Sequence, residues 1–174
     1  MNEGGDPLVV LAGQAGPLLR ERKFTLALAE SCTGGLLGSL ITDVAGSSDY
    51  FLGSAVTYAY SAKKAILGVR EETLAEHGAV SPQTAQEMAQ AARRLFGADV
   101  ALSVTGIAGP TGGLPGKPVG LVCLHLSAPD AEIGERHVWG SDRLGTKQLS
   151  AEAALRLLVR YLETGRRGDG EMGR

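Results

Sequence analysis

The sequence predicts an α/β domain of three layers, a sandwich with helices on both faces of a mixed, mainly parallel sheet. Apolar runs of strand length alternate with helical repeats along the chain. The runs at 100–104 and 119–126 show little polar alternation, which is typical of strands covered on both faces. A length of 174 residues suits one domain with its own core. We expect this domain over 1–163 and a disordered tail, rich in glycine and charge, over 164–174.

Six elements are predicted in the first half of the chain. They are a helix over 6–23, a strand over 24–29, a helix over 34–45, a turn over 46–49, a strand over 50–58 and a short helix over 61–67. Asp6 is a candidate N-cap of the first helix, and Pro7 suits its first position. Gly13, Gly16 and Pro17 weaken this helix and favour a break or a short element.

The second half is predicted to contain two helices and three strands. They are a helix opened by Ser81-Pro82 and closed by Gly97, strands over 100–104, 119–126 and 133–139, and an amphipathic helix over 148–163. The last two strands are close enough in sequence to form an antiparallel hairpin. The strand over 133–139 alternates more than the others, so we expect it nearer an edge of the sheet.

The composition excludes several classes of protein. A formal net charge of −2 argues against a protein that binds nucleic acid by neutralising phosphates. No apolar segment approaches the length of a membrane span, and no basic region followed by an apolar stretch opens the chain. Cys32 and Cys123 have no metal-ligand spacing. These features predict a reduced cytoplasmic protein without a metal site.

The segment 29–35, Ala-Glu-Ser-Cys-Thr-Gly-Gly, is the most informative feature of the sequence. An apolar strand ends there in small polar residues and a helical pattern begins at once, which predicts a serine at a strand-to-helix turn. Free N–H groups at such a helix start stabilise an anion or a developing oxyanion. Ser31 or Thr33 would also serve as an ordinary N-cap, and the segment taken alone favours that simpler interpretation.

A glycine-rich loop over 105–117 follows the buried strand and contains five glycines and two prolines. Loops at the carboxyl ends of strands bind ligands in α/β sheets. No Gly-Lys-Ser/Thr opens a helix here and no helical pattern follows, so the loop matches neither a Walker loop nor a dinucleotide fingerprint. Its length inside a compact domain favours a functional loop over a flexible surface connection.

Ser31 and Cys32 are the candidate nucleophiles, and a serine needs a base to take its proton. The histidines do not predict a Ser-His-Asp triad, because His77 is expected in a loop and His125 and His137 inside strands. A lysine with a lowered pKa is the other base that activates serine. The candidate lysines are Lys63, Lys64 and Lys117. Because a solvated surface charge is the ordinary role of lysine, the residue types alone leave the mechanism open.

Eight short segments follow one another over nearly the whole chain. They are 29–35, 51–58 ending Val-Thr-Tyr, 62–63 (Ala-Lys), 67–69 (Leu-Gly-Val), 77–81 (His-Gly-Ala-Val-Ser), 104–110 (Val-Thr-Gly-Ile-Ala-Gly-Pro), 117–120 (Lys-Pro-Val-Gly) and 140–143 (Gly-Ser-Asp-Arg). Together they resemble the CinA carboxy-terminal domain family. Either glycine-rich segment alone would be weak evidence, whereas the agreement of all eight in order is specific.

The resemblance implies hydrolysis of the carboxamide of nicotinamide mononucleotide (NMN) to nicotinic acid mononucleotide and ammonia, a step of pyridine nucleotide salvage, with no cofactor. It implies Ser31 as the nucleophile and Lys63 as the base, with Tyr58 and Thr105 completing the hydrogen-bonding network. The residues that it places around the substrate are Cys32, Thr33, Gly34, Gly35, Gly106, Gly109 and Arg143, the last facing the phosphate. It also implies a homo-oligomer, with a dimer favoured, and no direct binding of nucleic acid or membrane.

The sequence departs from the family pattern at two positions. Tyr60 stands where members often have asparagine, and Lys147 stands where a second arginine is expected. Lysine lacks the planar fork of arginine, so substrate affinity is in question more than the reaction. The large amino-terminal domain of full-length members is missing, so a stand-alone form is expected. The alternatives are a slow or inactive module that binds pyridine nucleotides and an interaction protein linked to competence and DNA damage.

Overall fold

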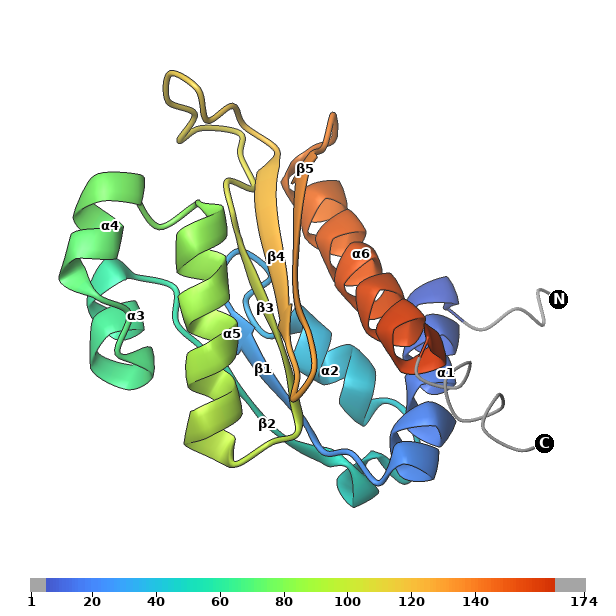
Figure 1. The fold of residues 1–174 in the computed structure, drawn as a ribbon. Coiled ribbons are helices and arrows are strands. Elements are labelled where there is room, and N and C mark those ends of the chain that lie inside the picture. Colours follow the sequence, from blue (N-terminus) through green and yellow to red (C-terminus); the bar gives the residue numbers. More distant parts are fainter. Residues whose placement is uncertain (1–5, 165–174) are drawn as a thin grey trace, which may run out of the picture.

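A computed structural model describes residues 6–164 and shows a five-stranded sheet between two layers of helices (Figure 1). The strands are β1 (Leu26–Glu30), β2 (Phe51–Val56), β3 (Val100–Gly106), β4 (Leu121–Ser127) and β5 (Glu132–Val138). The helices are α1 (Pro7–Arg22), α2 (Leu36–Thr42), α3 (Tyr60–Leu67), α4 (Glu71–His77), α5 (Pro82–Phe96) and α6 (Arg143–Thr164), with a 3-10 turn at Ser47–Asp49. The expected tail lies outside the described residues from 165 onward.

The two helical layers are built from different parts of the chain. Helices α3, α4 and α5 cover one face of the sheet, where α5 packs across the strands. Helices α1, α2 and α6 cover the other face, where α1 packs along α6. Both layers bury alanine, leucine and valine against the sheet, so the predicted three-layer α/β architecture is confirmed.

The sheet is mixed, with strand order β2-β1-β3-β4-β5. Strand β1 pairs in parallel with β2 and β3, whereas β4 pairs antiparallel with β3 and β5. The predicted hairpin is therefore confirmed, and the pairings divide equally between the two kinds. All residues of β4 are buried, while β5 alternates along the sheet edge as expected.

Several element boundaries differ from the prediction. Helix α1 is continuous through Pro17, and Gly16 lets it approach the Tyr50 ring, since an added Cβ there would lie 3.0 Å from the Tyr50 hydroxyl. Helix α2 is shorter than predicted, and α6 begins at Arg143 rather than Gln148. Helix α4 was not predicted, because its seven residues bury few side chains and give little periodic signal.

The carboxyl ends of the parallel strands β2, β1 and β3 meet at one edge of the sheet. The turn after β1, the connection after β2 and the long loop after β3 therefore start side by side. Helices α5 and α6 also begin at this edge, because each runs antiparallel to the strand direction (Figure 1). This edge gathers most of the residues singled out from the sequence.

Candidate active site

Ser31 is the first residue after β1, and its position is fixed by the neighbouring strands. Its N–H donates to the carbonyl of Val104 in β3 at 2.9 Å, and the preceding carbonyl of Glu30 accepts from the N–H of Thr57 at 2.8 Å. The Ser31 side chain is buried. The hydroxyl is thus held at the carboxyl edge of the sheet between two backbone anchors.

Lys63 on α3 places its ammonium against the Ser31 hydroxyl, with 2.8 Å between Nζ and Oγ. The side chain is 0% exposed, and no carboxylate of the described residues pairs with it. Burial lowers the pKa of Lys63 from 10.5 to about 8, because removing the ammonium from water penalises its charged form. The segment 60–67 folds as a short helix, and its inward face carries this lysine beside the predicted nucleophile.

The other contacts of Lys63 determine what its nitrogen can do. Nζ donates to the backbone carbonyls of Thr57 at 2.7 Å and Tyr58 at 3.2 Å. An ammonium uses its three hydrogens on these two carbonyls and on Ser31 Oγ. A neutral amine has only two hydrogens, so the carbonyls keep both and the lone pair faces the Ser31 hydroxyl. The geometry therefore suits a lysine base that takes a proton from serine.

Glu30 is a buried acidic residue whose role the sequence did not reveal. Its side chain is 0% exposed and accepts hydrogen bonds from five donors. They are the N–H groups of Gly35 (3.0 Å), Leu37 (3.1 Å) and Gly38 (2.8 Å) and the hydroxyls of Thr33 (2.8 Å) and Ser54 (2.9 Å). The carboxylate thus caps the amino end of α2 from the strand before it. The position of Glu30 just before a glycine-rich helix start is the sequence signal that could have predicted this capping role.

The Glu30 contacts reduce the number of donors that are available to the expected anion site. The N–H of Gly35 and the hydroxyl of Thr33 are taken by the carboxylate, and the N–H of Gly34 donates to the Ser31 carbonyl at 3.0 Å. These three donors are therefore used within the protein, and their expected contact with a substrate stays a prediction. Within residues 6–164, no acceptor from another residue takes the N–H of Cys32 or Thr33. These two donors next to Ser31 are the ones that could hold an oxyanion.

Cys32 is unsuited to act as the nucleophile. Burial raises the pKa of its thiol to about 12, so the reactive thiolate is absent near neutral pH. The thiol lies against Gly106, where an added Cβ would sit 3.0 Å from the sulfur and 2.6 Å from a methyl of Val122. Gly106 therefore allows β3 and β4 to close around the turn, and its expected contact with a substrate stays a prediction.

Tyr58 and Thr105 do not join the Ser31–Lys63 pair through their side chains. The Tyr58 side chain is 60% exposed, and only its backbone carbonyl contacts Lys63. The buried Thr105 hydroxyl donates to the carbonyl of Ala79 at 2.7 Å, because the connection between α4 and α5 crosses over the end of β3. Nothing in the sequence indicated this crossing, so the expected hydrogen bond of the Thr105 side chain was assigned to the wrong partner.

Arg143 begins α6 and joins two of the loops at this edge. Its guanidinium donates to the Gly109 carbonyl at 2.7 Å and to the Tyr58 hydroxyl at 2.8 Å. Lys147, one turn further along, approaches Gly34, since an added Cβ on Gly34 would lie 3.8 Å from its Nζ. Lys147 thus stands beside the Ser31 turn and Arg143 joins the loops after β2 and β3, so the two cations could attract an anionic group at this edge of the sheet.

The remaining candidate residues lie elsewhere. Lys64 forms an exposed ion pair with Glu71 at 2.8 Å, and Lys117 donates to the His77 carbonyl. His77 ends α4 instead of lying in a loop. The described residues contain no cluster of three or more His, Cys, Asp or Glu that could hold a metal ion. No helix among them is long and apolar enough to cross a membrane.

Comparisons with known proteins show to which family the chain is related. The family model for the CinA C-terminal domain matches residues 9–162. A CinA-like protein of Desulforapulum autotrophicum is 52% identical over 82% of this chain, and one of Salinibacter ruber is 51% identical over 84%. The chain spans only 34% and 36% of the lengths of these two relatives.

Solved structures match the fold over almost their whole lengths. A CinA superfamily protein from Klebsiella pneumoniae has a TM-score of 0.88 at 32% identity, covering 91% of this chain and 99% of that one. A competence/damage inducible protein from Agrobacterium tumefaciens has a TM-score of 0.87 at 38% identity, covering 94% and 99%. The likeness therefore covers the whole domain in each of these two structures.

Proposed function

The chain belongs to the CinA C-terminal domain family, and from this premise and its Ser31–Lys63 pair we propose that it is an NMN amidohydrolase. The observation that carries the proposal is the 2.8 Å contact between a buried serine hydroxyl and a fully buried lysine whose pKa is lowered to about 8. At pH 7 about a tenth of such a lysine is neutral and able to accept a proton.

In the proposed reaction, neutral Lys63 takes the proton of Ser31 as Oγ bonds to the carboxamide carbon. The N–H groups of Cys32 and Thr33 are the donors offered to the oxyanion of the tetrahedral intermediate. Lys63 then gives its proton to the leaving nitrogen, the C–N bond breaks and ammonia departs. Water attacks the acyl-enzyme while Lys63 accepts its proton. Loss of the acyl–oxygen bond returns that proton to Ser31 and frees the acid.

Arg143 and Lys147 are proposed to hold the phosphate of NMN. Both side chains come from the first turns of α6, whose positive amino end adds to their charge. Arg143 keeps two contacts, to Gly109 and Tyr58, which hold its guanidinium beside the site. Tyr60, the other departure from the family pattern, accepts from the N–H of Ala79 and leaves the Ser31–Lys63 contact undisturbed. The expected dimer stays a prediction.

Ammonia release from NMN by the wild-type protein and by Ser31→Ala tests this function. We expect wild-type turnover, and in the variant a loss of about a thousandfold or more with the fold intact, because Ser31 is the hydroxyl that Lys63 contacts among residues 6–164 and the neighbouring Cys32 thiol stays protonated. Ser39→Ala, which removes an exposed hydroxyl from α2, is the matched control and should turn over normally.

The other outcomes separate the alternatives. A thermal shift on adding NMN without ammonia release would indicate a nucleotide-binding module. Neither a shift nor turnover would favour an interaction protein, in keeping with the competence-damage names of relatives such as the one from Halothermothrix orenii. Equal turnover by wild type and Ser31→Ala would exclude Ser31 as the nucleophile.

A further inference from the structure

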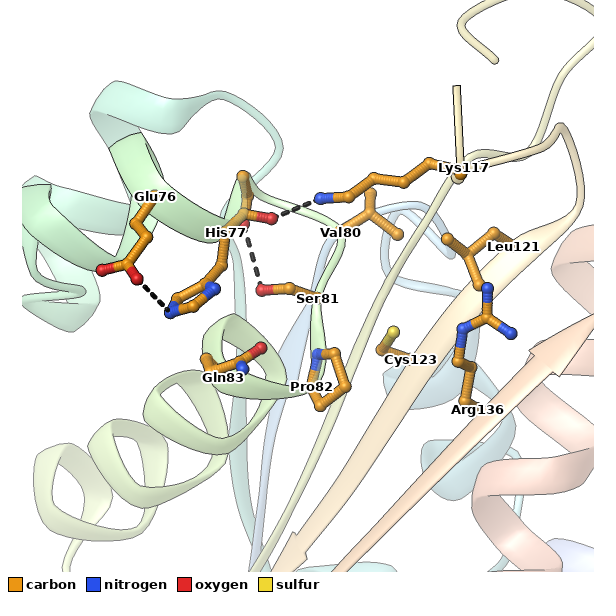
Figure 2. Close-up of a pocket in the computed structure, with 12 residues that line it drawn as sticks. Glu76, His77, Val80, Ser81, Pro82, Gln83, Lys117, Leu121, Cys123 and Arg136 are labelled. Atoms are coloured by element: carbon orange, nitrogen blue, oxygen red, sulfur yellow. Dashed lines mark hydrogen bonds and ion pairs between the residues drawn. The ribbon is translucent and has the colours of Figure 1, made fainter. Parts of the chain in front are cut away.

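A cavity of about 400 Å³ lies between the amino end of α5 and strands β4 and β5 (Figure 2). Its volume falls in the range of small-molecule sites. Neither Ser31 nor Lys63 lines it. Its floor includes the buried side chains of Leu121 and Cys123. It is thus a hollow separate from the proposed nucleophile.

Two of the segments that carry the family resemblance meet at this cavity. His77 ends α4, Ser81 caps the start of α5, and Lys117 comes from the end of the long loop. None of these side chains contacts the Ser31–Lys63 pair. The connection between α4 and α5 separates the two sites. On the Ser31 side the Thr105 hydroxyl donates to its Ala79 carbonyl, and on the cavity side Lys117 donates to the His77 carbonyl. These motifs are therefore left unexplained by the proposed amidase chemistry.

The charges at the cavity are mainly positive. Lys117 uses one ammonium hydrogen on the His77 carbonyl and keeps two for other acceptors. Within residues 6–164, the guanidinium of Arg136, which lines the cavity beside Leu121 (Figure 2), has neither an ion pair nor a hydrogen bond. Both cations influence Cys123 on the floor of the cavity. Burial raises the pKa of its thiol, and the charges of Arg136 and Lys117 each oppose that rise. The acid at the rim, Glu76, has a 76% exposed side chain turned to the His77 ring.

We propose that this cavity is a second ligand site, which binds the phosphate or diphosphate group of a small molecule between Lys117 and Arg136. The Arg136 guanidinium supplies a planar fork of N–H donors, and the Lys117 ammonium supplies donors on a flexible side chain. Together they suit a group with several phosphate oxygens. The positive end of the 15-residue helix α5 opens toward the same space, with the side chain of Gln83 on its first turn. The remaining volume takes the rest of the molecule.

Calorimetric titration of the full chain with inorganic pyrophosphate tests the site. We expect saturable binding that weakens as salt is added. Arg136→Gln and Lys117→Gln should each reduce the affinity about tenfold or more. Arg94→Gln, which removes the same charge from an exposed position at the other end of α5, is the control and should bind as the wild type does. Thermal melts of each variant verify folding.

A second part of the experiment tests whether the cavity binds the phosphate of NMN during the proposed amidase reaction. Pyrophosphate should bind equally well to Ser31→Ala, and Arg136→Gln should keep the KM of the wild type for NMN. A KM raised by tenfold in Arg136→Gln would make the cavity part of the amidase site and overturn its independence. Absence of pyrophosphate binding at millimolar concentration, or equal affinity in all variants, would overturn the site itself. Because binding is read directly, this result does not depend on turnover of NMN.

Discussion

Glu30 and Lys63 are both 0% exposed, yet they occupy opposite faces of the sheet at the same strand end and have different surroundings. Glu30 faces α2, where five backbone and hydroxyl donors surround its carboxylate. Lys63 comes from α3 in the opposite layer, and its partners are two carbonyls and the Ser31 hydroxyl. Both side chains are fully hydrogen-bonded, and neither has a partner of opposite charge among the described residues. The donors around Glu30 anchor the start of α2, whereas burial of the Lys63 ammonium lowers its pKa to about 8, so this lysine loses its proton easily.

The turn between them shows why the two roles can be so close. Ser31 directly follows Glu30 in the chain, so the carboxylate that fixes the start of α2 also fixes the backbone beside the proposed nucleophile. The contact with the Ser31 hydroxyl is then completed by one side chain from α3, that of Lys63. We infer that positioning and chemistry are divided between the two faces of β1.

The largest effect that would test this division is expected from Lys63→Arg. A guanidinium stays protonated and cannot accept the Ser31 proton, so ammonia release from NMN should fall about a thousandfold. Lys64→Arg, a change of the same kind at the exposed neighbour, should keep full activity. If Lys63→Arg retained activity within tenfold of the wild type, the lysine would not be the base.

The pH dependence of kcat/KM should be the next largest effect. Lys63 must be neutral to act, and its pKa is lowered to about 8, so activity is lost as the pH falls below that value. From pH 8 down to pH 6 the decline should approach about tenfold per unit, with a plateau above the pKa. A profile that is flat between pH 6 and 9 would contradict a titrating lysine, and Lys64→Gln should leave the profile unchanged.

Glu30→Gln should affect stability. The amide keeps the shape but presents an NH₂ group to donors that need an acceptor, which should lower the free energy of unfolding by about 2–3 kcal/mol. The melting temperature should then fall by roughly 5–10 °C. Ser54→Ala, which removes one of the five donors, should cost about 1 kcal/mol. Equal melting temperatures for Glu30→Gln and the wild type would mean that the carboxylate does not hold the turn.

The sequence predicted most of the fold because its signals are local. Continuous apolar runs indicated the buried strands, and Ser81 and Gly97 marked the two ends of α5 as the structure has them. Helix α4 gave no comparable signal, since it is short and rests on its neighbours. Pro17 was misleading, because tertiary packing keeps α1 continuous around it.

The candidate site was less predictable, because its contacts join residues far apart in the chain. The pair Ser31–Lys63 came from the family resemblance, and nothing in the spacing alone selected Lys63 over Lys64. The hydroxyl of Thr105 was assigned to this pair, but the connection between α4 and α5 lies above it and takes its hydrogen bond. Alternation along a strand indicates a face of the sheet, but it does not show which segment covers that face.

The complete burial of Lys63 also determines which reagents can modify it. A lowered pKa makes its amine more nucleophilic at mild alkalinity than an ordinary lysine, yet an acylating reagent in solution reaches the exposed lysines first. A molecule must occupy the space at Ser31 before it can meet this nitrogen. If Ser31 and Lys63 have the proposed roles, a covalent inhibitor must first fit the space at Ser31, where it would bond to the serine Oγ after Lys63 takes the hydroxyl proton.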